Sequence, residues 1–177
     1  MSTQFKPPSC LSDNLVEFAL QEGLKCKNIH VRNIVYSPGS AGGDNYCSDI
    51  IRAKVTYSKG GAVKTDLFLI IKCIQPSPET DLLVKMGVFD IEERMYSNVL
   101  LRVEVILQKS ISPRCYFTCL KPTKTFFMDD LTYYGYKIGD RTKKLDLELA
   151  EIVMKHLGQY HAGSMVFAKQ FPKKQRN

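Results

Sequence analysis

The residue with the clearest chemical meaning is a lone lysine in an apolar stretch. Lys72 lies within LFLIIKCI (67–74), where a buried cation needs an anionic partner. A helix is predicted to follow, and it carries adjacent carboxylates at Glu92 and Glu93. A strand lysine paired with a glutamate of the next helix positions nucleotide phosphates in kinases. The alternative is a lysine whose ammonium reaches solvent at a sheet edge.

A glycine-rich turn upstream of Lys72 is the second candidate. In GSAGGDNY (39–46) the missing side chains let backbone N–H groups approach phosphate oxygens. A strand follows, and no Gly-Lys-Ser/Thr is present, so the turn is neither a P-loop nor a dinucleotide fingerprint. Gly42, Gly43 and Asn45 are the predicted phosphate contacts, and an ordinary flexible hairpin is the alternative.

The third candidate is Met128-Asp129-Asp130-Leu131, at the end of a predicted strand. Two adjacent carboxylates can hold a metal ion, but no further acid lies close in sequence. We therefore interpret 128–131 as a hinge whose backbone contacts a nucleotide base, with Met128, Asp129 and Leu131 as its contacts. Plain solvated turn residues are the next interpretation.

Composition limits the function classes. The chain has 177 residues, 44% of them hydrophobic and 24% charged, which excludes wholesale disorder. Its formal charge of +7 favours anionic partners such as nucleotides. The longest apolar run, 67–71, is far too short to span a bilayer, so no membrane association is predicted. The N-terminus does not resemble a secretory signal, which predicts a cytoplasmic protein with free thiols at all six cysteines.

Hydrophobic periodicity predicts which elements position these residues. Helices are expected over 13–23, 80–101 (with a possible break at Gly87) and 145–169. Strands are expected over 29–36, 51–57, 66–74, 115–120 and 125–128, with a Gly60-Gly61 hairpin and the third strand at the centre of the sheet. His161 lies on the apolar side of the last helix and is predicted to be a core histidine.

This order predicts an α+β fold in which a five-stranded antiparallel sheet receives one inserted helix after its third strand. That is the architecture of the small lobe in protein-kinase-like folds, and the last helix would then open the large lobe. The predicted divisions are a loose leader (1–11), the small lobe (12–131), a linker with the first large-lobe helix (132–168) and a basic tail (169–177).

In the same order, short motifs resemble the ecdysteroid kinase-like family of the aminoglycoside and choline kinase superfamily. They are SAGGDNYCS (40–48), IIK (70–72), VFDIEERMY (88–96), PRCY (113–116), DDL (129–131), GYK (135–137), DR (140–141), LDLE (145–148) and HAGSM (161–165). The resemblance implies transfer of the ATP γ-phosphate to a hydroxyl of a small lipophilic molecule such as an ecdysteroid. It also implies that Lys72 binds phosphate with Glu92 as its helix partner, that Gly43 is the loop glycine, and that 128–131 is the hinge.

The sequence also departs from the family pattern. Lys144 stands where members usually carry glycine, and the His-Gly-Asp catalytic loop and the later metal-binding aspartate are absent. Magnesium is expected for the family, but its ligands are missing from these 177 residues. We therefore expect an N-terminal portion of such a kinase that binds ATP weakly and is inactive alone.

Two other classes stay open. One is a non-catalytic nucleotide-binding or partner-regulating module, with a protein partner on the exposed face of the last helix. The other is a nucleic-acid binder that uses Lys169, Lys173, Lys174 and Arg176 of the basic tail. Nucleic acid is the less favoured partner, because the chain has no aromatic-rich basic strand of the RRM type.

Overall fold

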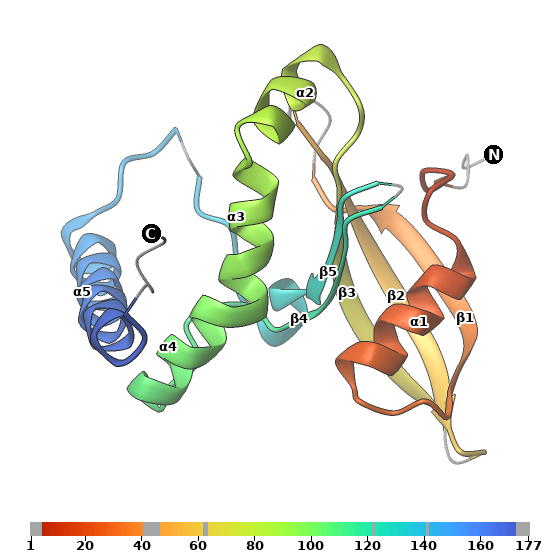
Figure 1. Cartoon of the computed structure of the whole chain (residues 1–177). Coiled ribbons are helices and arrows are strands. Elements are labelled where there is room, and N and C mark those ends of the chain that lie inside the picture. The colour runs from red at the N-terminus through yellow and green to blue at the C-terminus, as the bar shows by residue number, and fades with distance from the viewer. Residues whose placement is uncertain (1–4, 41–46, 62–63, 122, 141, 173–177) are drawn as a thin grey trace, which may run out of the picture.

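A single curved sheet separates two groups of helices in the computed structural model (Figure 1). The structure describes residues 5–40, 47–61, 64–121, 123–140 and 142–172. All strand pairs are antiparallel, in the order β1-β2-β3-β5-β4. The strands are β1 (Ile29–Pro38), β2 (Asp49–Lys59), β3 (Thr65–Cys73), β4 (Cys115–Cys119) and β5 (Thr125–Asp129). The α+β prediction of a five-stranded antiparallel sheet with a central third strand is therefore confirmed.

The period of two along β2 assigns its side chains to opposite faces of the sheet. Ile51, Ala53 and Val55 are buried in the core beneath the first helix. Arg52 and Lys54 lie on the other face, where they form ion pairs with Asp130 and Asp66. β3 lies at the centre of the sheet, as predicted; Leu69, Ile71 and Cys73 are buried on the α1 side, and Phe68, Ile70 and Lys72 are half-buried on the other face.

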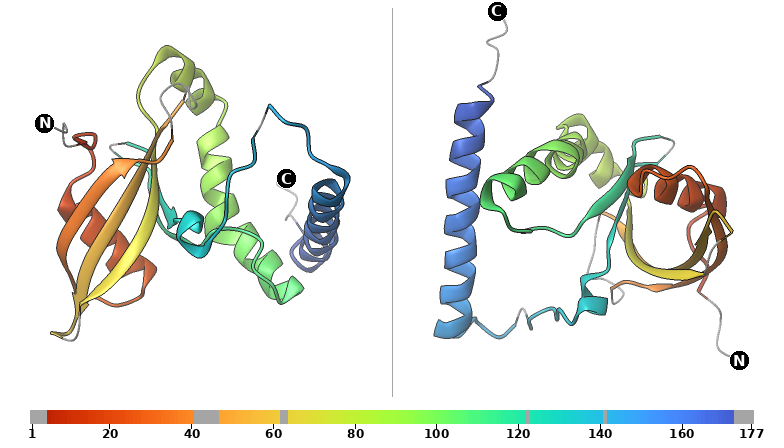
Figure 2. Two further views of the ribbon diagram at one scale, coloured as in Figure 1. Left: turned by 180° about the vertical axis from the view of Figure 1, so that it is seen from behind. Right: turned by 90° about the horizontal axis from the view of Figure 1, so that it is seen from below.

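Helix α1 (Asp13–Gly23) fills the concave face of the sheet and contacts both edge strands, β1 and β4 (Figure 2). Ser12 caps its start by accepting a hydrogen bond from the amide of Leu15. At its other end a Cβ on Gly23 would lie 2.5 Å from the Cβ of Tyr116 on β4, so only glycine allows this close approach. The Arg114 guanidinium donates to the Gly23 carbonyl oxygen at 2.8 Å. One helix thus joins the two edges of the sheet.

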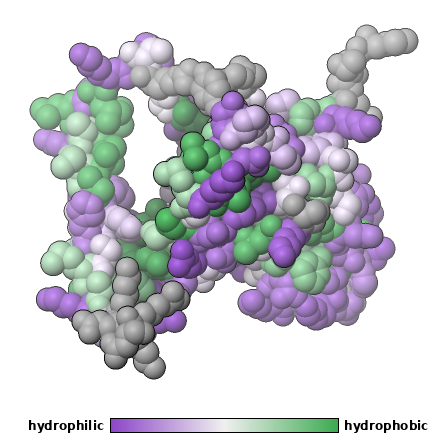
Figure 3. Space-filling model, turned by 45° about the horizontal axis from the view of Figure 1, so that its top comes forward, coloured by the Kyte–Doolittle hydropathy of each residue, from purple (hydrophilic) through white to green (hydrophobic). Residues whose placement is uncertain are grey.

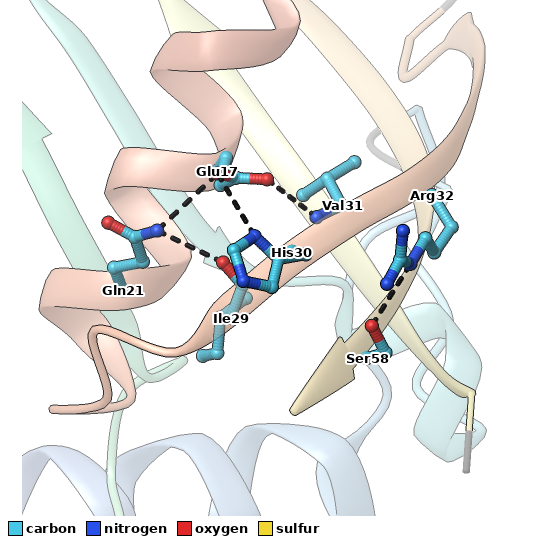
Figure 4. A network of polar contacts seen from close by, with 7 residues as sticks. All are labelled: Glu17, Gln21, Ile29, His30, Val31, Arg32 and Ser58. Atoms are coloured by element: carbon cyan, nitrogen blue, oxygen red, sulfur yellow. Dashed lines mark hydrogen bonds and ion pairs between the residues drawn. The ribbon is translucent and has the colours of Figure 1, made fainter. Parts of the chain in front are cut away.

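Side chains of α1 also satisfy backbone groups on the outer side of β1 (Figure 4). The strand has a bulge at Arg32: Val31 pairs with Tyr57 and Asn33 with Thr56, so two steps along β1 match one step along β2. The Val31 amide donates to Glu17 at 2.7 Å. Gln21 donates to the Ile29 carbonyl at 3.0 Å. These contacts occupy groups that an exposed edge strand would leave unpaired.

Three consecutive helical segments and a π-helical turn cover the other face of the sheet: α2 (Pro78–Lys85), α3 (Val88–Arg94), the turn Met95–Val99 and α4 (Leu100–Leu107). Gly87, with φ of 73°, separates α2 from α3, which confirms the predicted break. The helix runs to Leu107, beyond the predicted end at Leu101. Packing stabilises these extra turns, because Val103 is fully buried against Gly163 of the last helix.

The last helix, α5 (Leu147–Gln170), begins at Asp146, which caps it by accepting from the Leu149 amide at 2.8 Å. It packs on α4 at Gly163, where a Cβ would lie 2.9 Å from Val103. A 3-10 turn (Leu131–Tyr134) and an extended segment connect it to β5. The prediction of a buried His161 is wrong: its side chain is exposed, because it does not lie in the strip that packs on α4.

Apolar side chains cover much of the exposed surface of α5, as the helix at the left of Figure 3 shows. The most exposed are Leu147, Leu149, Ile152, Val153, Met154, Leu157 and Met165. Among the described residues, no helix has the length and hydropathy needed to cross a membrane. All six cysteines are free thiols, as predicted.

Glu104 anchors the loop between α4 and β4. One of its carboxylate oxygens accepts from the amides of Ile111 (2.9 Å) and Ser112 (3.0 Å) and from the hydroxyls of Ser110 and Ser112. Burial alone raises the pKa of Glu104, but these hydrogen bonds outweigh it, so the pKa lies below the ordinary value of 4.5. Glu104 therefore stabilises the fold in its charged form.

We expect Glu104→Gln to lower the free energy of unfolding by about 1–2 kcal/mol at pH 7. A carboxyl whose folded-state pKa is depressed stabilises the fold above the unfolded pKa, and the stabilisation is lost as the pH falls through the folded value. The difference between wild type and variant should therefore shrink below about pH 4.5. Urea unfolding of both proteins across pH 3.5–7 measures it, and a difference independent of pH would contradict the assignment.

Candidate functional site

Lys72 forms an ion pair with Glu92 on the face of the sheet opposite α1. Its Nζ lies 2.7 and 2.9 Å from the two carboxylate oxygens, and each side chain is about a quarter exposed (23% and 24%). The same Nζ lies 5.7 Å from the centre of the Phe126 ring. The prediction of an acid partner on the following helix is confirmed, with Glu92 as that partner. Glu93 instead accepts a hydrogen bond from Thr118 at 3.5 Å.

Local sequence explains why α3 presents Glu92 to Lys72. A capping box of Ser77 and Thr80 starts α2, and the left-handed Gly87 turns the chain into α3. Phe89 then anchors α3 in the core on this face, at 3% exposure. Asp90 forms an ion pair with Lys124 just before β5, which ties the helix to the sheet. Glu92 lies within the same short helix.

A cavity of about 400 Å³ lies on the same sheet face as Lys72. Ile50, Ile70 and Met128 form its apolar floor, and residues 129–132 border it. Ile50 is the cross-strand partner of Lys72, and Ile70 lies two residues before Lys72 on β3. Two residues of strand span about 7 Å, so the lysine lies beside this floor. The cavity has the size and apolar lining of a small-molecule site.

The structure brings together most of the predicted site residues. Met128, Asp129 and Leu131 of the hinge all line the cavity. Lys72 and Glu92 are not lining residues, but Lys72 is the cross-strand partner of Ile50 in the cavity floor. Gly42, Gly43 and Asn45 lie outside the described residues. Gly39, at the start of the same glycine-rich turn, lines the cavity.

The two hinge carboxylates point to different partners. Asp129 accepts from the Tyr116 hydroxyl at 2.6 Å. Asp130 accepts from Arg52 at 2.5 Å and from both the amide and the hydroxyl of Thr132, at 3.0 and 2.6 Å. Asp130 is 2% exposed, so the alternative of solvated turn residues is wrong for it. Asp130 therefore joins the hinge to β2 through Arg52, and Asp129 joins it to β4 through Tyr116.

Arg52 is the site residue that sequence reasoning missed. Its side chain lines the cavity and holds Asp130 across the sheet. The available signal was its position on the polar side of β2, in register with the apolar Ile70 on β3. Tyr96 closes another part of the cavity, and burial, followed by the nearby charge of Glu92, raises the pKa of its hydroxyl. The phenol therefore stays neutral at physiological pH.

One comparison with known proteins gives a match. The family model described as the ecdysteroid kinase-like family matches residues 42–177, which is most of the chain and includes Lys72, Glu92 and the hinge. No curated protein and no solved structure matches the chain.

Proposed function

Because the chain belongs to the ecdysteroid kinase-like family, we propose that it binds ATP in the cavity between the sheet and the hinge. The observation that carries the proposal is the Lys72–Glu92 ion pair beside an apolar cavity on the same sheet face. An anchored lysine beside a flat apolar floor suits a ligand with a flat base and a chain of phosphates. Lys72, Glu92 and all the described lining residues of the cavity except Gly39 lie within the matched range.

Each part of the cavity has a chemical role in this proposal. The base would lie on Ile50, Ile70 and Met128, with the backbone of the hinge at its edge. Lys72, beside the cavity floor, would neutralise phosphate charge, and Glu92 holds its ammonium in place with two hydrogen bonds. The Asp130–Arg52 ion pair holds the hinge in a fixed position relative to β2.

Among the described residues, no group of three or more His, Cys, Asp or Glu side chains gathers to hold a metal ion. The sequence also contains no His-Gly-Asp triplet. Phosphoryl transfer depends on metal ions and on a carboxylate that orients the nucleophile, and one lysine contact cannot replace them. We therefore propose that these 177 residues bind the nucleotide without transferring phosphate.

We further propose that the chain supplies the nucleotide-binding part of a phosphotransferase for a small lipophilic alcohol of the ecdysteroid type. This proposal rests on the family match alone. The other prediction, a protein partner on the last helix, remains a prediction, although the exposed apolar side chains of α5 agree with it.

Titration calorimetry with ATP, adenosine and inorganic triphosphate tests the nucleotide proposal. We expect ATP to bind with a Kd below about 1 mM, the upper end of usual enzyme–substrate values. Adenosine and triphosphate should each bind more weakly, because each fills one part of the site. The absence of saturable ATP binding would reject the proposal.

A transfer assay tests the second part. The 177-residue chain, incubated with ATP, magnesium and an ecdysteroid, should release no phosphorylated steroid above the enzyme-free background. Turnover above that background would show that residues other than the family's catalytic loop supply the chemistry.

A further inference from the structure

A second cavity, of about 370 Å³, lies along β4 between the end of α1 and the π-helical turn. It is lined by residues of three separate segments of the chain, within 23–25, 96–101 and 114–118, and none of them belongs to the proposed nucleotide contacts. One residue, Tyr96, lines both this cavity and the nucleotide cavity. The two cavities therefore share a wall.

The lining combines aromatic rings with positive charge. Tyr96, Tyr116 and Phe117 supply the rings, and Lys25 and Arg114 supply the cations. Among the described residues that line it, none is acidic. The Arg114 guanidinium donates to the Gly23 carbonyl oxygen and lies over the Tyr116 ring, 4.7 Å from its centre, and neither partner neutralises its charge. This surface suits a flat apolar body that carries one anionic group.

Carboxylates lie near this cavity, but among the described residues none forms an ion pair with Arg114 or Lys25. Glu93 accepts from Thr118, which lies four strand residues beyond Arg114, or about 13 Å along β4. Asp129 accepts from the Tyr116 hydroxyl at 2.6 Å, the charges of Glu92 and Glu93 act on Cys115, and Glu22 lies near Lys25. These negative charges reduce the attraction of the two cations for an anion but form an ion pair with neither cation.

The backbone around the cavity adds two features. β4 is an edge strand, so N–H and C=O groups on its outer side have no strand partner and can bond to a ligand. Lys25, two residues after the end of α1, adopts a left-handed conformation (φ of 53°). This conformation costs free energy for a non-glycine residue and sets the direction of the Lys25 side chain.

Contacts through Tyr96 connect this cavity to the nucleotide site. Tyr96 belongs to the π-helical turn that directly follows α3, the helix of Glu92. Its ring lies 6.3 Å from that of Phe126, and Phe126 in turn lies under the Lys72 ammonium at 5.7 Å. π-Helical turns are rare and often occur at functional sites. A ligand that moves Tyr96 would act on both members of the Lys72–Glu92 pair.

We propose that this cavity is a second ligand site, for a small organic anion with a flat apolar body, and that its occupancy changes nucleotide affinity through Tyr96. The binding part stands on the cavity alone. The coupling part rests on the proposed nucleotide site, and by linkage it is reciprocal between the two ligands.

The probe for the site is 2-naphthoate, and the uncharged 2-naphthamide is its matched control. Amide NMR spectra of the ¹⁵N-labelled chain should shift for Lys25 and residues 114–118 as naphthoate is added, and naphthamide should bind about fivefold more weakly. Shifts confined to Ile50, Ile70 and Met128 would place the probe in the nucleotide cavity and overturn the proposal, as would equal affinity for the two probes.

Lys25→Asn removes the cation and keeps a residue that tolerates the left-handed conformation. It should weaken naphthoate binding about fivefold and leave naphthamide binding unchanged. Lys64→Asn removes an exposed lysine from outside this cavity and should change neither. A dispersed NMR spectrum shows that each variant is folded. Equal losses in both variants would reduce the effect to net charge and contradict a site.

Calorimetric ATP titrations with and without saturating naphthoate test the coupling. We expect the ATP affinity to change by at least threefold in wild type and to be unaffected by naphthoate in Tyr96→Leu. An unchanged wild-type affinity would reject the coupling. If naphthoate binds at β4 but ATP does not bind at all, the nucleotide proposal fails and the second site stands.

Discussion

Lys72→Met is expected to weaken ATP binding at least tenfold. Methionine keeps the apolar stem over the Phe126 ring but removes the ammonium that Glu92 holds in place. A hydrogen bond to a charged group contributes about 1.5–3 kcal/mol, and 1.4 kcal/mol corresponds to a factor of ten. Calorimetric titration of both proteins with ATP measures the loss.

The sheet offers a closely matched control for this substitution. Lys54, on β2, also forms an ion pair with one acid, Asp66 at 2.8 Å, and its Nζ also lies 5.7 Å from a ring, that of Phe68. Neither lysine is a lining residue of the cavity, but Lys72 is the cross-strand partner of Ile50 in its floor, whereas Phe68, the cross-strand partner of Lys54, does not line it. Lys54→Met should therefore leave ATP affinity within about twofold of wild type. Equal losses in the two variants would remove Lys72 from the site.

Asp130→Ala should lower the free energy of unfolding by about 2–4 kcal/mol. The substitution removes the cap of the Leu131–Tyr134 turn, made through Thr132, and leaves Arg52 without its carboxylate. Breaking a fully buried ion pair costs about 3–5 kcal/mol, but the Arg52 side chain is 36% exposed, so solvent reduces the cost. Urea unfolding at pH 7 measures the change.

Two further variants separate the ion pair from the cap. In a double-mutant cycle, Arg52→Ala combined with Asp130→Ala should show a coupling of about 1 kcal/mol or more, because the side chains are in direct contact. Asp129→Ala removes the neighbouring carboxylate, which accepts one hydrogen bond from Tyr116, and should cost about 1 kcal/mol. Additive effects of Arg52 and Asp130 would show that the pair does not hold the hinge.

The sequence was sufficient for the elements with strong local signals. Ser12 before an apolar helical pattern located α1, and Gly87 located the break between α2 and α3. The end of α4 was predicted too early, because Val103 is held by packing against Gly163, a contact between distant parts of the chain. His161 was wrongly placed in the core, because periodicity defines the faces of a helix but does not show which face another element covers.

The site was predictable where one residue required a partner. A single lysine in an apolar strand needs an anionic partner, and Glu92 was one of two candidate acids on the next helix. Arg52 gave no such signal, because an arginine on the polar side of a strand is ordinary until the fold places Asp130 above it. The second cavity was not predictable, since Lys25, Tyr96 and Arg114 become neighbours only when the sheet curls around α1.

The joining of both sheet edges by α1 also sets the order in which the chain can fold. The contact between Gly23 and Arg114 spans 91 positions. At about 5–20 residues per second, a ribosome needs roughly 5–18 s to add that length. During this interval α1 can pack on β1 but not on β4, so the contacts that close the sheet around the helix form last.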